Sequence, residues 1–400
     1  MNKKYVWFQN GSILSYDNSD CYLNEKIIPK EQLSDSKDLA KSKQKAFYES
    51  LFKKHFRNVV VLTGAGTSIN NGGKTRADLW DIDCKSEIEA INAEIKDLKD
   101  EDFYKKKDIE GLLSYITLYE KLNGEIEVEK ISLRRKLENK IVTACTLKIK
   151  TGDSTHEEFL KKITARKPSD PRIKLFTLNY DLLFEEAANN SGFTIIDGFS
   201  FSYPRTFSGK YFDLDIVNRE KTRIKNEESF DSKVFHLYKM HGSLKWHKEG
   251  DKIKQTEKPE NPLIIYPAND KYESSYEQPY FEMMSRFQQA LRKENTLLIV
   301  IGFGFGDKHI QNVINEAVDQ NSSFHLAIIN FKGKDEGMEI NDFKQFFINI
   351  EKKQIKKNVT IIYDSFEDFV EKYPSNNTYL DQEKQDLEKN NGGSNEAIQS

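Results

Sequence analysis

Residues 59–80 (VVVLTGAGTSINNGGKTRADLW) constrain the fold of this chain more than any other stretch. Val59–Leu62 form a short apolar, mostly β-branched run, which is typical of a strand buried on both faces. Gly64–Ser68 follow at once, and glycines there let the backbone approach a ligand closely and adopt positive φ without a steric penalty. We expect a helix after Ser68, whose free N–H groups would suit a phosphate. A tight strand-to-helix turn without a ligand explains these residues equally well, because one glycine loop is a weak signal.

Apolar strands and amphipathic helices alternate along the rest of the chain. This alternation predicts an α/β fold, Rossmann-like, with a mostly parallel sheet covered by helices on both faces. Further strands are expected over Ile173–Leu178, Thr194–Ile196, Val234–Met240, Thr296–Ile301, Phe324–Ile329 and Val359–Tyr363. Helices are expected after Asp181 to about Asn190, over Tyr280–Lys293, after Asp307 and over Phe366–Tyr373.

Changes in composition divide the chain into parts. Residues 1–45 are expected to form an N-terminal appendage of short strands and a lead helix, used for pairing at a sheet edge or for contact with a partner. Residues 46–373 form the main domain. Within it, residues 86–166 are rich in Glu and Lys, with apolar residues three and four apart, and predict a helical insertion domain. Residues 200–232 predict a loop-rich insertion, and residues 374–400 predict a disordered tail.

Composition excludes several classes of function. The 61 basic and 64 acidic residues give a net charge of −3, so no overall field favours nucleic acid, and we expect no direct nucleic-acid binding. No apolar run has the length of a membrane span, and no signal peptide is recognisable, so the expected location is cytoplasmic. The cysteines Cys21, Cys84 and Cys145 are far apart and the histidines show no pairing, so neither a disulfide framework nor a metal site is expected.

Polar clusters follow the predicted strands at the points where these strands end. Because ligands of parallel sheets bind at the carboxyl ends of the strands, we expect these clusters to form one site. The clusters are Gly64–Ser68, Asn179–Asp181, His241–Ser243, Gly302–Asp307 and Asn330.

Four of these clusters, in this order, resemble motifs of the sirtuin superfamily. Gly64–Ser68 (GAGTS) is similar to its GAGxS opening, and Thr177–Asp181 (TLNYD) is similar to its T-Q-N-x-D element. Met240–Gly242 contains the His-Gly pair of sirtuins, and Leu326–Asn330 (LAIIN) is similar to a late strand whose Asn reaches the adenosine side of NAD. The resemblance covers roughly residues 55–370.

The chain also departs from the sirtuin pattern. Residues 73–78 (GKTRAD) lack the P-D-F-R sequence of sirtuin deacylases, and whether Arg76 or Asp78 replaces its residues stays open. The four-cysteine zinc module is absent, with the helical insertion in its place. Gly302–Ile310 (GFGFGDKHI) instead resembles the IGFSFGDxHI element of bacterial sirtuin-like proteins, a branch that includes NAD-consuming effectors of antiphage defence.

The resemblance implies an NAD hydrolase (NAD glycohydrolase, NADase) of the antiphage-defence type. It would use NAD as its substrate, need no metal, and release nicotinamide and ADP-ribose. The alternatives are an NAD-dependent protein deacylase and a non-catalytic sensor that binds NAD or ADP-ribose. The residues expected to bind NAD are Gly64, Ala65, Gly66, Thr67, Ser68, Gly302, Gly304, Asp307 and Asn330.

Three residues are expected to be catalytic: Asn179, Asp181 and His241. Nicotinamide departs as a neutral molecule from a cationic ring, so the reaction needs a held ribose, a stabilised cationic centre and a positioned water rather than an acid. Asn179 offers a donor and an acceptor for ribose hydroxyls and water, and His241 can take a proton near neutral pH. Asp181 would hold the nicotinamide amide or stabilise the cation. N-capping of the following helix is the alternative role of Asn179 and Asp181.

An unregulated NAD hydrolase would kill its host, and the chain shows no obvious sensor domain. We therefore expect a homo-oligomer that is controlled by a partner protein. Similar single-domain chains are found beside a HerA-type motor ATPase, which makes such an ATPase the first candidate.

Overall fold

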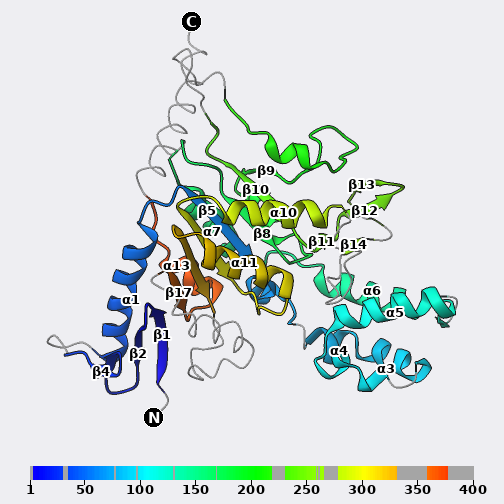
Figure 1. The fold of residues 1–400 in the computed structure, drawn as a ribbon, viewed down its shortest axis with the longest axis horizontal. Helices are drawn as coiled ribbons and strands as arrows, with labels where there is room; N and C mark the ends of the chain where they lie inside the picture. Colours follow the sequence, from blue (N-terminus) through cyan, green and yellow to red (C-terminus); the bar gives the residue numbers. More distant parts are fainter. Residues whose placement is uncertain are drawn as a thin grey trace, which may run out of the picture.

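The computed structural model describes residues 3–29, 35–75, 78–95, 98–128, 131–167, 169–218, 230–257, 259, 262–264, 278–330 and 358–376. In this part of the chain, one large sheet organises the fold (Figure 1). Its strands are β1 (Lys4–Gln9), β2 (Ser12–Tyr16), β3 (Cys21–Leu23), β4 (Lys26–Ile27), β5 (Asn58–Thr63), β8 (Lys174–Thr177), β9 (Thr194–Ile196), β10 (Val234–Lys239), β15 (Thr296–Ile301), β16 (Phe324–Ile329) and β17 (Val359–Ile362).

The sheet has the order β4-β3-β2-β1-β17-β16-β15-β5-β8-β10-β9. The segment from β17 to β9 is parallel, and β1–β4 continue it as an antiparallel meander. The central strand β5 is buried on both faces: Val60 and Leu62 belong to one core cluster, and Val59 and Val61 belong to the other. This two-sided burial confirms the predicted α/β class with a mostly parallel sheet.

Helices cover both faces of the sheet, as the alternation predicted. On one face, α10 (Tyr280–Leu291) and α11 (Lys308–Gln320) contribute Met283, Phe287, Ile310 and Ile314 to the core. The opposite face is covered by α1 (Ser36–Phe52), α7 (Thr155–Thr164), α8 (Leu183–Asn190) and α13 (Phe366–Lys372).

The N-terminal strands join the main sheet through β1. Trp7 in β1 is aligned with Ile362 in β17, and its ring stacks on Phe47 of α1 with a centroid distance of 4.4 Å. Of the two uses expected for residues 1–45, the structure shows edge pairing. The expected boundary at residue 45 falls inside α1, because the apolar residues of this helix serve both the hairpin (Leu39) and the main core (Leu51).

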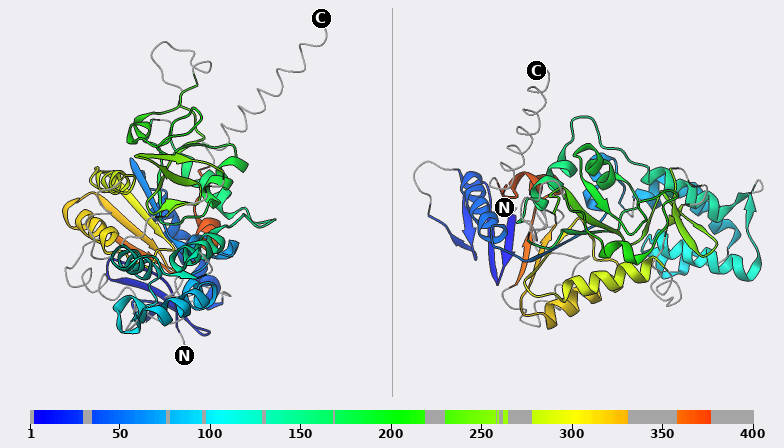
Figure 2. Two further views of the ribbon diagram at one scale, coloured as in Figure 1. Left: turned by 90° about the vertical axis from the view of Figure 1, so that its right-hand side faces the viewer. Right: turned by 90° about the horizontal axis from the view of Figure 1, so that it is seen from above.

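The helical insertion forms a lobe with its own core. It contains a π-helical turn (Leu79–Asp83), α3 (Lys85–Glu94), α4 (Asp102–Lys105), α5 (Ile109–Asn123), the short strands β6 (Glu127–Val128) and β7 (Ile131–Ser132), and α6 (Leu133–Cys145). Figure 2 shows this lobe at the end of the molecule opposite β1–β4. The expected bounds 86–166 need correction at both ends. Trp80 already belongs to the core of the lobe, whereas α7 packs on the main sheet through Phe159 and Ile163.

The expected loop-rich insertion over residues 200–232 is loop-rich where it is described, with a 3₁₀ turn at Gly209–Asp213. Its aromatic residues Phe207 and Phe212 pack against the main core near Trp246 in β12 (Trp246–Glu249), which pairs with β13 (Lys252–Gln255). Residues 219–229, and residues 377–400 of the expected tail, lie outside the described residues. Among the helices described, none is long and apolar enough to cross a membrane.

A buried histidine in α7 makes the stability of the folded protein depend on pH. His156 is 2% exposed, lies against the rings of Phe184 and Phe366, and has no hydrogen-bond partner for either ring nitrogen among the described residues. Burial lowers the pKa of His156 from 6.5 to about 4, although Asp181 and Asp153 oppose the shift. Burial also lowers the pKa of His236, in β10, to about 4.

We predict that the protein loses stability as the pH falls from 6.5 to 4. In this window the unfolded chain binds a proton that the folded chain excludes at His156, so the free energy of unfolding decreases by at most about 1.4 kcal/mol per pH unit for each such histidine. His156→Leu should flatten this dependence, and His236 should leave a residual slope. Urea unfolding at several pH values measures it. His247→Gln, at a less buried histidine, is the control, and an unchanged slope in His156→Leu would contradict the prediction.

Candidate active site

Neighbouring strands of the sheet carry all the polar clusters that the sequence singled out. β16, β15, β5, β8 and β10 are consecutive in the sheet and parallel, so their carboxyl ends lie side by side at the same end of the strands. In this order they are followed by Asn330, Gly302–Asp307, Gly64–Ser68, Asn179–Asp181 and His241.

The glycine loops after β5 and β15 pack against each other. The N–H of Gly64 donates to Ile301 O at 3.0 Å, and that of Gly66 donates to Gly302 O at 2.9 Å. A Cβ on Gly66 would lie 2.5 Å from Gly302 Cα, and Gly302 has a φ of +63°. Gly64 and Gly66 are therefore required by the contact between the two loops, whereas the sequence suggested close approach to a ligand.

The helix expected after Ser68 is replaced by two short 3₁₀ turns, Ala65–Thr67 and Ile69–Asn71. Gly72, with a φ of +92°, ends the second turn, and the N–H of Gly73 returns to Ser68 O at 2.8 Å. The Asn-Asn-Gly-Gly sequence therefore reverses the chain before an α-helix can form. The loop after β5 therefore offers no α-helix N-terminus at which a phosphate could bind.

Other loop positions remain open. Gly304 is exposed, and a Cβ built on it would meet no atom within 4 Å. Ala65 is also exposed, and Gly66, Asn179 and Phe303 are half-buried. A ligand can approach the strand ends over these residues.

Asn179 holds the glycine loop through its side chain. Its amide nitrogen lies 2.9 Å from Ser68 Oγ, 3.1 Å from Gly64 O and 3.2 Å from Thr67 Oγ1. Thr67 Oγ1 in turn donates to Gly64 O at 2.9 Å. The amide group is thereby fixed in orientation beside the loop. Its oxygen Oδ1 accepts no hydrogen bond from the residues that the structure describes.

Asp181 is buried behind Ser68. Its Oδ2 accepts from Ser68 Oγ at 2.6 Å, and its Oδ1 accepts from the N–H of Leu183 at 3.2 Å, at the start of α8. The second contact is of the capping type that the sequence offered as the alternative role. The first contact links Asp181 through Ser68 to Asn179.

A buried lysine holds the loop after β8 in place, and the sequence analysis did not identify it. The ammonium of Lys239, at the end of β10, donates to the backbone carbonyl of Asp181 and lies 3.0 Å from Glu185 Oε1. Burial raises the pKa of Glu185, and Lys239 partly opposes this rise. A Lys at the last position of a strand whose other residues are mostly apolar or aromatic, VFHLYK, was the available signal.

His241 pairs with Asp307 across the strand ends. His241 Nε2 lies 3.3 Å from Asp307 Oδ2, and the two side chains are 6% and 8% exposed. Asp307 Oδ1 accepts from the N–H groups of His309 and Ile310 at 2.8 and 3.2 Å, at the start of α11. Burial alone would raise the pKa of Asp307, but the hydrogen bond and charge of His241 and the two backbone N–H groups bring this pKa below its usual value.

For the remaining predicted residues, the structure shows only local contacts or gives no description. Asn330 is half-buried at the end of β16, and its backbone N–H donates to Ile362 O at 2.9 Å. Asp78 accepts from Thr75 Oγ1 at 2.7 Å within its own turn, and Arg76 lies outside the described residues. In the part of the chain that is described, no group of three or more His, Cys, Asp or Glu could hold a metal ion.

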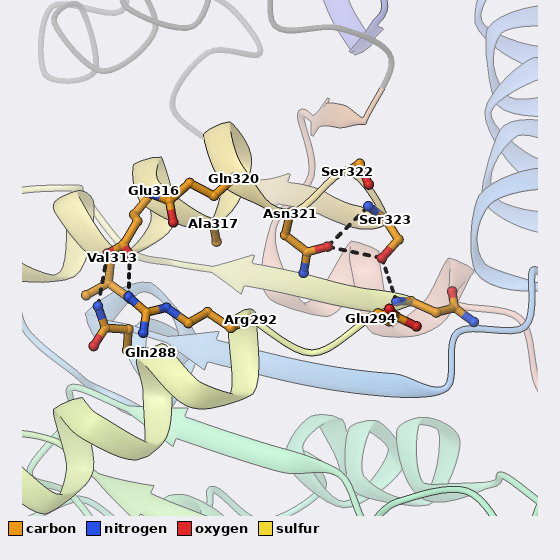
Figure 3. Close-up of a pocket in the computed structure, with 11 residues that line it drawn as sticks. Gln288, Arg292, Glu294, Val313, Glu316, Ala317, Gln320, Asn321, Ser322 and Ser323 are labelled. Carbon is orange, nitrogen blue, oxygen red and sulfur yellow. Dashed lines mark hydrogen bonds and ion pairs between the residues drawn. The ribbon is translucent and has the colours of Figure 1, made fainter.

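A cavity lies at the other end of these strands, near the residues where they begin. It has a volume of about 530 Å³ and lies between α10 and α11, near the first residues of β15 and β16. Figure 3 shows its polar lining, in which Gln288 and Arg292 contact Glu316. None of the predicted site residues lines this cavity.

We predict that Gly66→Ala destabilises the protein by about 1–3 kcal/mol, because the added Cβ would meet the backbone of Gly302. Gly304→Ala is the matched control from the facing loop, and its effect should stay within about 0.5 kcal/mol, because a Cβ there meets nothing. Urea unfolding of the two variants measures the difference. Equal stabilities would show that the loops are not in contact as described.

Comparison with known proteins agrees with part of this picture. Residues 174–350 match the family model described as a SIR2-like domain. The match begins at the first residue of β8 and includes Asn179, His241 and Asp307, but it covers less than half of the chain and excludes the glycine loop after β5.

Two solved structures are among those that match this chain. One is a crystal structure of Sir2 in complex with the inhibitor EX-527, 2'-O-acetyl-ADP-ribose and deacetylated p53 peptide. It is 13% identical, covers 78% of this chain and 100% of that chain, and has a TM-score of 0.34. The other, on the structural basis of sirtuin substrate affinity, is 13% identical, covers 78% and 99%, and has a TM-score of 0.33.

Among curated proteins, none matches this chain. The SIR2-like match is thus the finding that supports the resemblance to the sirtuin superfamily. It covers four of the five strands that carry the site, β8, β10, β15 and β16, and leaves out β5.

Proposed function

We propose that this protein hydrolyses the nicotinamide–ribose bond of NAD and releases nicotinamide and ADP-ribose. The observation that carries the proposal is the position of Asn179 and His241. They follow adjacent parallel strands, β8 and β10, within the region that matches a SIR2-like domain and next to the loop that Asn179 contacts.

Cleavage of the nicotinamide–ribose bond requires few protein groups, and we propose that the residues at these strand ends provide them. Asn179 is held by three loop oxygens through its amide nitrogen, which leaves an uncharged acceptor, Oδ1, for a ribose hydroxyl or the attacking water. Because the amide is already fixed, little orientational freedom remains to be lost when it engages the substrate. His241 is the base that takes a proton from a ribose hydroxyl or from the water.

The buried carboxylate of Asp181 contributes negative charge close to Asn179. Both of its oxygens have partners, Ser68 and Leu183, and the side chain is buried. We therefore propose that Asp181 stabilises the developing positive charge of the ribose through space, in surroundings of low dielectric constant.

The glycine loops offer the surface for the dinucleotide. Ala65 and Gly304 are exposed, a Cβ on Gly304 would meet no atom within 4 Å, and Asn330 follows β16, the strand next to β15. We propose that NAD lies across these positions. As in the sequence analysis, we propose that the biological role is NAD depletion in antiphage defence, by a homo-oligomer controlled by a partner such as a HerA-type motor ATPase.

We predict that the purified protein releases nicotinamide from NAD without an acetylated peptide. His241→Ala and Asn179→Ala should each lower this rate by roughly a hundred- to ten-thousand-fold, through loss of the base and of positioning, and the double variant should lose little more. NAD should still bind to each variant in calorimetry. His247→Ala, in β12, is the matched control and should keep the wild-type rate.

The same assay separates the alternatives. Release only in the presence of acetylated peptide would favour a deacylase, and NAD binding without release would favour a sensor. Wild-type rates in both His241→Ala and Asn179→Ala would show that the active site lies elsewhere.

A further inference from the structure

We propose that Asp307 is a positioning residue for His241: its carboxylate fixes the orientation and the tautomer of the imidazole. The inference rests on the proposed function in one respect, that His241 is the base. It assigns to Asp307 a role in the reaction through His241, beyond the contact with NAD that its place in the glycine loop suggested.

Both ends of this interaction are held rigidly. Asp307 Oδ1 is fixed by the N–H groups of His309 and Ile310 at the start of α11, a helix of 13 residues. His241 is followed by Gly242, whose φ is +92°. A Cβ built on Gly242 would lie 2.1 Å from Leu263 O, in the short strand β14 (Leu263–Ile264), so the backbone is closely packed there. Neither the carboxylate nor the backbone beside the histidine can shift easily.

The geometry selects one tautomer. A carboxylate only accepts hydrogen bonds, so the ring nitrogen that faces Asp307 Oδ2, Nε2, carries the proton. Nδ1 then holds the lone pair with which a neutral imidazole acts as a base. Because the carboxylate and the ring are almost fully buried, water competes little for this hydrogen bond.

Capping of α11 alone does not explain the contact. A cap requires one oxygen, which Oδ1 supplies, and Ser, Thr or Asn would serve as well. The second oxygen instead reaches a histidine that follows a different strand, 66 positions away in sequence. This separation of roles makes a sharp test possible.

Asp307→Asn keeps the capping oxygen but turns an amide NH2 toward Nε2. Since an NH2 group donates, it should select the opposite tautomer, with the proton on Nδ1. Asp307→Ser keeps a capping oxygen and removes the group that faces His241. Asp17→Asn is the matched control. Buried Asp17 also accepts from two backbone N–H groups, at Ser19 and Asp20, and its second oxygen accepts from the hydroxyl of Tyr22, where Asp307 has a histidine.

The tautomer is read by NMR on full-length protein labelled with ¹⁵N-histidine, at a pH where the imidazole is neutral, and His241→Ala identifies the signal. We expect the Nε2–H form in the wild type and in Asp17→Asn, the Nδ1–H form in Asp307→Asn, and a mixture in Asp307→Ser. Nicotinamide release at saturating NAD should fall by roughly a hundred- to ten-thousand-fold in Asp307→Asn, with a melting temperature close to that of Asp17→Asn.

The outcomes separate this inference from the proposed function. An unchanged tautomer in both Asp307 variants overturns the inference, whether or not the protein hydrolyses NAD. A switched tautomer with wild-type turnover overturns it too, while NAD hydrolysis stands. A switched tautomer in a protein that never releases nicotinamide supports the pairing and rejects the proposed reaction. If Asp307→Asn does not fold, Asp307→Ser decides.

Discussion

The in-register pairing of β15 with β5 is the constraint on which the site depends. Residues Thr296–Ile301 align one to one with Asn58–Thr63, so both strands end at the same level. The residues that follow, Gly302 on one strand and Gly64 to Gly66 on the other, therefore meet, and their backbones come so close that no side chain fits between them. A shift of one residue would place a bulky residue at this contact and reverse the face of every side chain in β5.

From this contact, two hydrogen-bonded groups extend over the neighbouring strands. On one side, Asn179, Ser68 and Asp181 tie the β5 loop to the β8 loop. On the other side, Asp307 in the β15 loop reaches His241 after β10. Each group joins residues more than 60 positions apart in sequence, so it depends on the sheet to bring the strand ends together. The proposed function and the proposed role of Asp307 both rest on this arrangement.

Much of the fold could be predicted because strand and helix periodicity is local. The strand Thr296–Ile301 has the predicted bounds, and the helix after Asp181 ends at Asn190 as expected. The bounds of the helical insertion could not be predicted, because the apolar spacing of α7 is the same whether Phe159 packs on the sheet or on α6. The predicted helix after Ser68 does not form because Gly72 adopts a left-handed conformation and Gly73 closes a turn onto Ser68 O. The roles of Lys239 and Asp307 depend on partners more than 50 positions away, which no local pattern reveals.

The meander at the N-terminus has a consequence for how copies of this protein can associate. With β1–β4 added, the outermost strands in the described part of the sheet are β4, of two residues, and β9, of three. Strands this short expose few unpaired backbone groups, so the sheet offers a poor template for extension by a strand from another molecule. Continuous sheets across subunits and edge-to-edge aggregation are thereby disfavoured. Self-association of this chain is expected instead to bury side chains, for example on the helices that flank the sheet or on those of the lobe formed by α3–α6.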